Sequence, residues 1–239
     1  MNSTRKLASH NSMSYMPAKG KGFLMNIAER FSKCQDLTYK QQYAFGVRLF
    51  DLRIRFQETV PYFAHGIVEY CEVNAYQVLD FLNKKGDCIV NLVLENTSGI
   101  GESQNNAFAA LCKECEEKYN TIRFMGGWSK YPGNHPVIYK FQKTSISYAE
   151  HYIVFKELNK AIDDIQHGKD INFSEITKHV GEFIAGPITA AKAQNPKSWS
   201  EWLNNAKTEN TYLWIDFVEV GAPQSWVDTH PYIHAESEI

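Results

Sequence analysis

The hydrophobic residues of this chain follow two spacings. Where they recur about every second position, or run together, they predict β-strands; where they recur every three or four positions, they predict amphipathic helices. On this basis we expect strands at residues 4–9, 47–56, 60–65, 88–95, 136–141, 145–150 and 212–219. We expect helices at residues 22–34, 36–46, 73–86, 103–119, 153–168 and 197–208.

This alternation of strands and helices is typical of parallel strands joined by crossover helices. No glycine-rich turn of the dinucleotide-binding type follows a strand, so a distorted TIM (β/α) barrel fits better than an open sheet. Such barrels commonly need about 250 residues, and the chain has 239 residues. We therefore predict a single domain over residues 1–239, although the pattern over 169–196 does not locate a further strand.

Composition narrows the classes of protein that remain. The chain is 44% hydrophobic and 22% charged, with a formal net charge of -2. These values are typical of a globular domain and argue against a nucleic-acid binder. No secretory leader is visible, so a cytoplasmic protein is expected, or a secreted one if a leader has been removed.

The cysteines do not form an evident framework. Five cysteines at irregular spacing argue against paired disulfides. Cys112 and Cys115 form a CxxC within the helix expected at 103–119, without a second pair of cysteines or histidines. We expect them to be two helix residues, one facing inward and one partly exposed, rather than a zinc site.

Polar residues recur where the expected strands end. The carboxyl ends of the strands of a parallel barrel meet at one rim, and side chains there converge. The residues expected at this rim are His10, Asn11, Asp51, Arg53, His65, Glu95, Lys140, Glu150, Tyr152 and Asp216.

Two histidines and an arginine at one rim suit the cleavage of a phosphodiester. Because the imidazole pKa is about 6.5, one ring can accept a proton from an attacking hydroxyl while the other donates one to the leaving oxygen. Arg53 can place a planar charge on the phosphate oxygens. A carboxylate beside each histidine would fix its tautomer, and Asp216 and Asp51 are the candidates.

Three motifs carry a resemblance to a known family. The stretches 9-SHNSM-13, 46-GVRLFDLRI-54 and 64-AHG-66, in this order, resemble the X-domain of phosphatidylinositol-specific phospholipase C. Looser similarity continues through 77–95, 147–158 and 214–220. The resemblance implies a distorted TIM barrel and a phosphorus–oxygen lyase reaction that converts phosphatidylinositol to diacylglycerol and a cyclic inositol phosphate.

The resemblance also implies a role for each matched residue. His10 matches the general base that activates the inositol 2-hydroxyl, and His65 matches the acid that protonates the diacylglycerol oxygen. Asp216 matches the carboxylate that orients the base, and Asp51 the carboxylate near the acid. The residues implied in substrate binding are Asn11, Glu95, Lys140, Glu150 and Tyr152.

Arg53 bears on the question of a metal cofactor. Calcium-dependent members of the family carry an acidic residue at this position, whereas the bacterial type carries arginine in place of the cation. Arg53 therefore predicts a metal-independent enzyme and disfavours calcium. Asn11 and Glu95, however, match the metal-dependent type.

Two other classes of protein remain open. A glycerophosphodiester phosphodiesterase is similar in fold, but resemblance to it would require Glu-x-Asp where this chain has Asp51-x-Arg53. A barrel that binds a phosphorylated headgroup without turnover is the other, and the two histidines argue against it.

A lipid substrate requires contact with a membrane interface. The stretch 124-FMGGWSKYPG-133 offers Phe124, Met125, Trp128, Lys130 and Tyr131 for a transient contact, although the same stretch could fold over the barrel. We expect the protein to act as a monomer on a phosphoinositide or related phospholipid.

Overall fold

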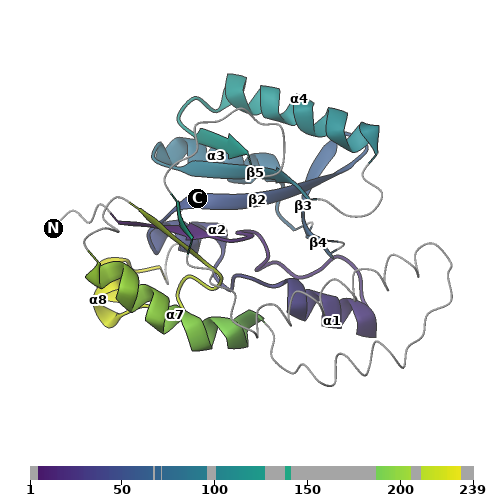
Figure 1. Cartoon of the computed structure of the whole chain (residues 1–239). Coiled ribbons are helices and arrows are strands. Elements are labelled where there is room, and N and C mark those ends of the chain that lie inside the picture. The colour runs from purple at the N-terminus through teal and green to yellow at the C-terminus, as the bar shows by residue number, and fades with distance from the viewer. Residues whose placement is uncertain are drawn as a thin grey trace.

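The computed structural model of the chain, drawn in Figure 1, describes residues 5–66, 68–70, 72–95, 101–126, 138–140, 187–205 and 211–232. The strand expected at 145–150 and the helix expected at 153–168 lie outside these residues. The segment 169–196 is described from Pro187 onward, where it forms the start of a helix.

The strands form one curled sheet. Among the described residues it has eight strands: β1 (Lys6–Ser9), β2 (Val47–Gln57), β3 (Val60–His65), β4 (Val68–Tyr70), β5 (Ile89–Leu94), β6 (Arg123–Gly126), β7 (Ile138–Lys140) and β8 (Tyr212–Ile215). Its parallel strands follow the order β6-β5-β2-β1-β8-β7. Because β1 pairs with β8, the first and last strands are neighbours, as in a distorted TIM barrel.

Two strands depart from the parallel arrangement that we expected throughout. β3 pairs antiparallel with β2, and β4 pairs antiparallel with β3. The expectation is wrong here because only Glu58 and Thr59 separate β2 from β3, which is too short for a crossover. Glu58 takes a left-handed conformation, with φ 57, in this tight turn. The hairpin sends the chain back along β2, so that His65 ends beside the middle of β2 rather than beyond it.

Helices cover the sheet on both sides. They are α1 (Phe23–Ser32), α2 (Tyr39–Ala44), α3 (Ala75–Lys85), α4 (Glu102–Lys118), α7 (Pro187–Asn204) and α8 (Gln224–Thr229). Figure 1 shows α3 and α4 along β2 and β5, with α7 and α8 at the other side of the molecule.

Local sequence signals set several of these bounds. Thr38 caps α2 through a reciprocal pair of hydrogen bonds with Gln41. Gly86, with φ 82, ends α3 in the left-handed conformation typical of a helix C-terminus. The last strand is shorter than expected, because the chain turns after Ile215 and Phe217 has φ 46. Asp216 therefore follows β8 instead of lying within it.

A cluster of three tryptophan rings packs near the start of β2. Trp199, Trp202 and Trp226 pack mutually with ring centroids 5.1 to 5.7 Å apart. The indole of Trp226 donates a hydrogen bond to the carbonyl of Phe45, just before β2 begins. This cluster ties α7 and α8 to the strand that carries much of the site.

Helix α4 places its cysteines as expected. Cys115 is buried and Cys112 is half-buried. None of the described helices is both long and apolar enough to cross a membrane.

Candidate active site

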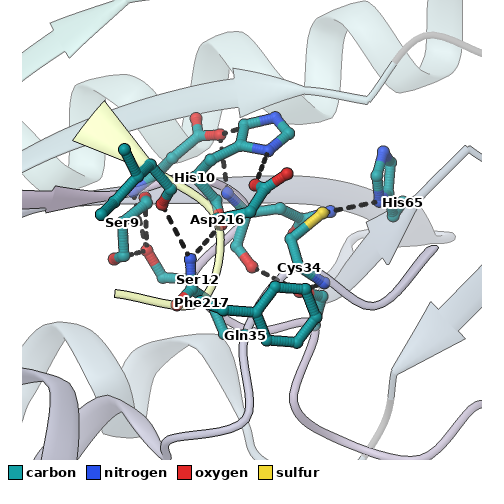
Figure 2. Close-up of polar contacts among 12 residues, drawn as sticks. Ser9, His10, Ser12, Cys34, Gln35, His65, Asp216 and Phe217 are labelled. Atoms are coloured by element: carbon teal, nitrogen blue, oxygen red, sulfur yellow. Dashed lines mark hydrogen bonds and ion pairs between the residues drawn. The ribbon is translucent and has the colours of Figure 1, made fainter. Parts of the chain in front are cut away.

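The polar residues at the rim come from strand ends that the sheet brings together. His10 and Asn11 directly follow β1, Asp51 and Arg53 lie on β2, and Asp216 directly follows β8. Since β1 lies between β2 and β8, these residues converge although the sequence separates them by up to 206 positions. Figure 2 shows His10, Asp216, Cys34 and His65 in one group.

His10 is held from both ring nitrogens. Its Nδ1 lies 2.7 Å from Oδ1 of Asp216, and its Nε2 lies 2.7 Å from Nη2 of Arg53. A guanidinium can only donate, so Nε2 must accept and Nδ1 must donate to the carboxylate. The contacts thus select the neutral tautomer whose lone pair is on Nε2.

Arg53 joins three of the expected site residues. Besides His10, its Nε donates to Asp51 over 3.1 Å and its Nη1 donates to Glu95 over 3.2 Å. Burial favours the neutral guanidine, but Asp51 and Glu95 outweigh this effect and raise the pKa of Arg53 above its ordinary value. The guanidinium is therefore a permanent positive charge at the rim.

Asp51 is completely buried and lies on the His10 side of the site. It accepts hydrogen bonds from the backbone N–H of Asn11 at 3.0 Å and from Nδ2 of Asn91 at 2.7 Å. Burial opposes its ionisation, but the charge of Arg53 and these contacts hold the pKa of the carboxyl below its ordinary value. We expected Asp51 beside the acid, whereas it lies 3.9 Å from Nε2 of His10.

His65 is oriented by a backbone carbonyl. Its Nδ1 donates to the carbonyl of Ser32 over 2.7 Å, and the hydroxyl of Tyr70 donates to Oγ of Ser32 over 2.6 Å. Burial, followed by the charge of Arg53, lowers the pKa of His65 well below 6.5. The ring centroids of His65 and His10 are 6.0 Å apart and the rings are nearly perpendicular.

Glu95 connects the guanidinium to the histidine on β3. One carboxylate oxygen accepts from Arg53, and the other accepts from the backbone N–H of Gly66 over 2.9 Å. Glu95 thus fixes the end of β3 relative to β2.

Asn11 has 1% of its surface exposed, and its Nδ2 finds no hydrogen-bond partner among the described residues.

Several residues that shape the site were not predicted. Gln35 donates from Nε2 to the carbonyls of His10 and Ile215, so it clamps the ends of β1 and β8 together. Cys34 places its Sγ 3.9 Å from Nδ1 of His65. Both residues lie in the short connection between α1 and α2, where the sequence pattern carries no strand-end signal.

Other predicted site residues are only partly placed. The backbone of Lys140 ends β7 and pairs with Trp214, two positions before Asp216, so it lies at the same edge of the sheet. Glu150 and Tyr152 lie outside the described residues, as do Trp128, Lys130 and Tyr131 of the expected membrane contact.

The structure contradicts part of that expected membrane contact. Phe124 and Met125 lie on β6 and are buried, at 9% and 4% exposure. They pair with Val90 and Asn91 of β5 and belong to the barrel. β6 was not expected from the sequence because it has only four residues, RFMG, and only Phe124 and Met125 of these are apolar.

The fold and the site define a class: a distorted TIM barrel with two histidines and one arginine gathered at the rim. No family model matches the chain, and no curated protein matches it. Solved structures do. Phosphatidylinositol-specific phospholipase C from Listeria monocytogenes matches with a TM-score of 0.56 at 14% identity, over 94% of this chain and 90% of that chain.

A double mutant of the phosphatidylinositol-specific phospholipase C from S. aureus matches with a TM-score of 0.56 at 16% identity, over 96% of this chain and 92% of that chain. A structure described as modulation of membrane binding of the same S. aureus enzyme matches with a TM-score of 0.54. At these identities the likeness establishes the distorted barrel fold.

Proposed function

We propose that this protein is a metal-independent phospholipase C that cleaves phosphatidylinositol, or a related inositol or lipid phosphodiester, to diacylglycerol and a cyclic inositol phosphate. One observation carries the proposal: His10 is held in a basic tautomer between Asp216 and Arg53, with His65 6.0 Å away. The fold shared with two bacterial enzymes of this name supports the choice of substrate.

His10 is the general base of this proposal. Its Nε2 accepts the proton of the inositol 2-hydroxyl as that oxygen forms a bond to phosphorus. The proton already shared between Nδ1 and Asp216 keeps the ring oriented, and the carboxylate stabilises the imidazolium that forms.

Arg53 binds the phosphate. In the free protein its Nη2 donates to Nε2 of His10, the atom that must become the base. When substrate binds, the inositol hydroxyl replaces Nη2 at Nε2, and Nη2 then donates to a non-bridging oxygen of the phosphate. Asp51 and Glu95 hold the other two nitrogens, so the group is oriented before substrate arrives. A fixed cation here performs the charge stabilisation for which a metal would otherwise be needed.

His65 is the general acid. As the bond from phosphorus to the diacylglycerol oxygen breaks, the ring gives its proton to that oxygen. Its depressed pKa means that it is neutral in the free protein near pH 7. An anionic phosphate beside it offsets the charge of Arg53 and favours the protonated ring, so the binding of substrate promotes protonation of the acid.

The remaining expectations on partners are part of the same proposal. The protein acts as a monomer at a membrane interface, and Asn11, Lys140, Glu150 and Tyr152 contact the headgroup. Among the described residues, the large apolar side chains most exposed to solvent are Phe23 and Val60, at 70% and 58%. They replace Phe124 and Met125 as candidates for contact with lipid.

The test is cleavage of phosphatidylinositol in vesicles in the presence of a chelator. The protein should turn over, and His10→Ala, His65→Ala and Asp216→Asn should each lower kcat by about 100-fold or more. Asp228→Asn, an exposed aspartate of α8, is the matched control and should retain full activity. Loss of turnover on chelation, or full activity of either histidine variant, would refute the proposal.

A further inference from the structure

The thiol of Cys34, a group that can bind soft metal ions, lies close to His10 and Asp216. Cys34 has 3% of its surface exposed and lies between α1 and α2. Potential ligand atoms of His10, Cys34 and Asp216 all lie within 4.8 Å of one another. Figure 2 shows the sulfur of Cys34 near Asp216 and directed toward His65, whose Nδ1 is 3.9 Å from it.

We propose that His10, Cys34 and Asp216 form an inhibitory site for a thiophilic divalent cation, of which Zn²⁺ is the type. Zinc takes imidazole nitrogen, thiolate sulfur and carboxylate oxygen at about 2.0–2.3 Å, with tetrahedral geometry. Three donors already this close can converge on one ion through small side-chain movements. Water fills the fourth position.

The charge around the cluster accommodates a cation. Asp51, Glu95 and Asp216 supply three carboxylates, and Asp51 and Glu95 both pair with the single guanidinium of Arg53. Arg53 contacts Nε2 of His10, whereas Asp216 marks the Nδ1 side where the ion would bind. Calcium is not expected here, because it selects oxygen ligands and six to eight of them.

Binding at Nδ1 would disable the base. The ion replaces the hydrogen bond between His10 and Asp216 and takes the lone pair of Nδ1, so the ring proton moves to Nε2. The thiol proton of Cys34 leaves to solvent. Nε2 then carries the ring proton and has no lone pair to accept a proton from substrate. Its N–H would also face the N–H of Nη2 of Arg53, which lies 2.7 Å from Nε2 in the structure, and two donors repel each other.

Cobalt reports the site without any assay of activity. Co²⁺ should bind the wild-type protein with a thiolate-to-cobalt absorption band in the near ultraviolet, and Zn²⁺ should abolish it by displacement. The band should be lost in Cys34→Ser and in Cys34→Ala but retained in Cys112→Ser, a half-buried thiol of α4. A band that survives in both Cys34 variants, or none in the wild type, overturns the proposal.

The Cys34 variants are expected to fold. The backbone N–H of Cys34 donates to Ser14 and its carbonyl accepts from Phe217, and neither contact involves the thiol. The near-ultraviolet circular dichroism of each variant checks this point before metal is added.

Inhibition is the second readout, and it rests on the proposed function. The rate of each variant is normalised to its own rate without zinc. Cys34→Ser should then need at least about 10-fold more zinc for half inhibition, because the loss of a residue that only supports a metal ligand already lowers metal affinity by about this factor. Equal sensitivity of Cys34→Ser and wild type overturns the inference. If no variant cleaves phosphatidylinositol, the cobalt spectrum still decides the metal site, so the two failures are distinguishable.

Discussion

The protonation state of His65 decides whether the free protein already holds the proton of the proposed general acid. Burial and the nearby charge of Arg53 lower the pKa of this ring well below 6.5. An unfolded chain binds the same proton near pH 6.5. As the pH falls through this range, the unfolded state takes up the proton first, so the stability contributed by neutral His65 is lost with acidification.

We predict that the His65 ring titrates below pH 6.5 in the free protein, as followed by NMR of the imidazole protons. Inositol phosphate should raise this pKa, because its charge offsets that of Arg53. The assignment uses His65→Ala, in which the titrating signal should be missing. A pKa at or above 6.5 without ligand would contradict the electrostatic account of the site.

The strand pattern predicted that four of the central residues converge, but it did not predict the partner of His65. His10, Asp51, Arg53 and Asp216 converge because they end or line neighbouring parallel strands, which the strand pattern reveals. The partner of His65 Nδ1 is a backbone carbonyl, and no side-chain pattern encodes it. A carboxylate was expected there because side chains are what a sequence displays.

At the scale of elements, the β2–β3 hairpin brings His65 into the site. The strands expected at 47–56 and 60–65 were already too close for a crossover helix, and this short connection should have predicted an antiparallel pair. Helices α2 and α3 were predictable from their terminal residues, Thr38 and Gly86. The early start of α7 was not. We expected a helix from residue 197, whereas α7 begins at Pro187 and contains Pro196, a residue that interrupts most helices.

The connection between α2 and β2 depends on Gly46. This residue has φ +102, and an added Cβ would lie 2.8 Å from Cζ2 of Trp226 and 3.2 Å from Cδ2 of His230. These two rings stack with centroids 4.3 Å apart and have little freedom to move. In an alanine variant, the free-energy costs of the strained backbone and of the steric overlap therefore add.

We predict that Gly46→Ala lowers the free energy of unfolding by about 2–4 kcal/mol, measured by urea denaturation. Gly86→Ala is the matched control, because Gly86 has φ +82 with nothing within 4 Å of an added Cβ. It should cost about 1 kcal/mol for the backbone alone. Equal losses in the two variants would show that contact with Trp226 is unimportant.

At the scale of the whole molecule, the proposed function requires the rim of the barrel to approach lipid. Phe23, the first residue of α1, is 70% exposed, so its phenyl group is available for contact with lipid. Phe23 begins α1, and Ser32, whose carbonyl accepts a hydrogen bond from His65, ends it, so one helix links the proposed lipid contact to the site.

We predict that Phe23→Ser lowers the rate on phosphatidylinositol vesicles by about 10-fold, the equivalent of losing the transfer of one phenyl group to an apolar phase. The rate on a soluble short-chain analogue should not change. If both rates fall together, Phe23 supports the fold of α1 instead of contacting lipid.

The identity of the product tests the central claim most directly. Phosphorus NMR of phosphatidylinositol treated with this protein and a chelator should show the signal of a five-membered cyclic phosphodiester before any linear inositol phosphate appears. That result requires the inositol hydroxyl to attack phosphorus, which is the step assigned to His10 and His65. A linear monoester as the first product, or no cleavage in the chelator, would contradict the account.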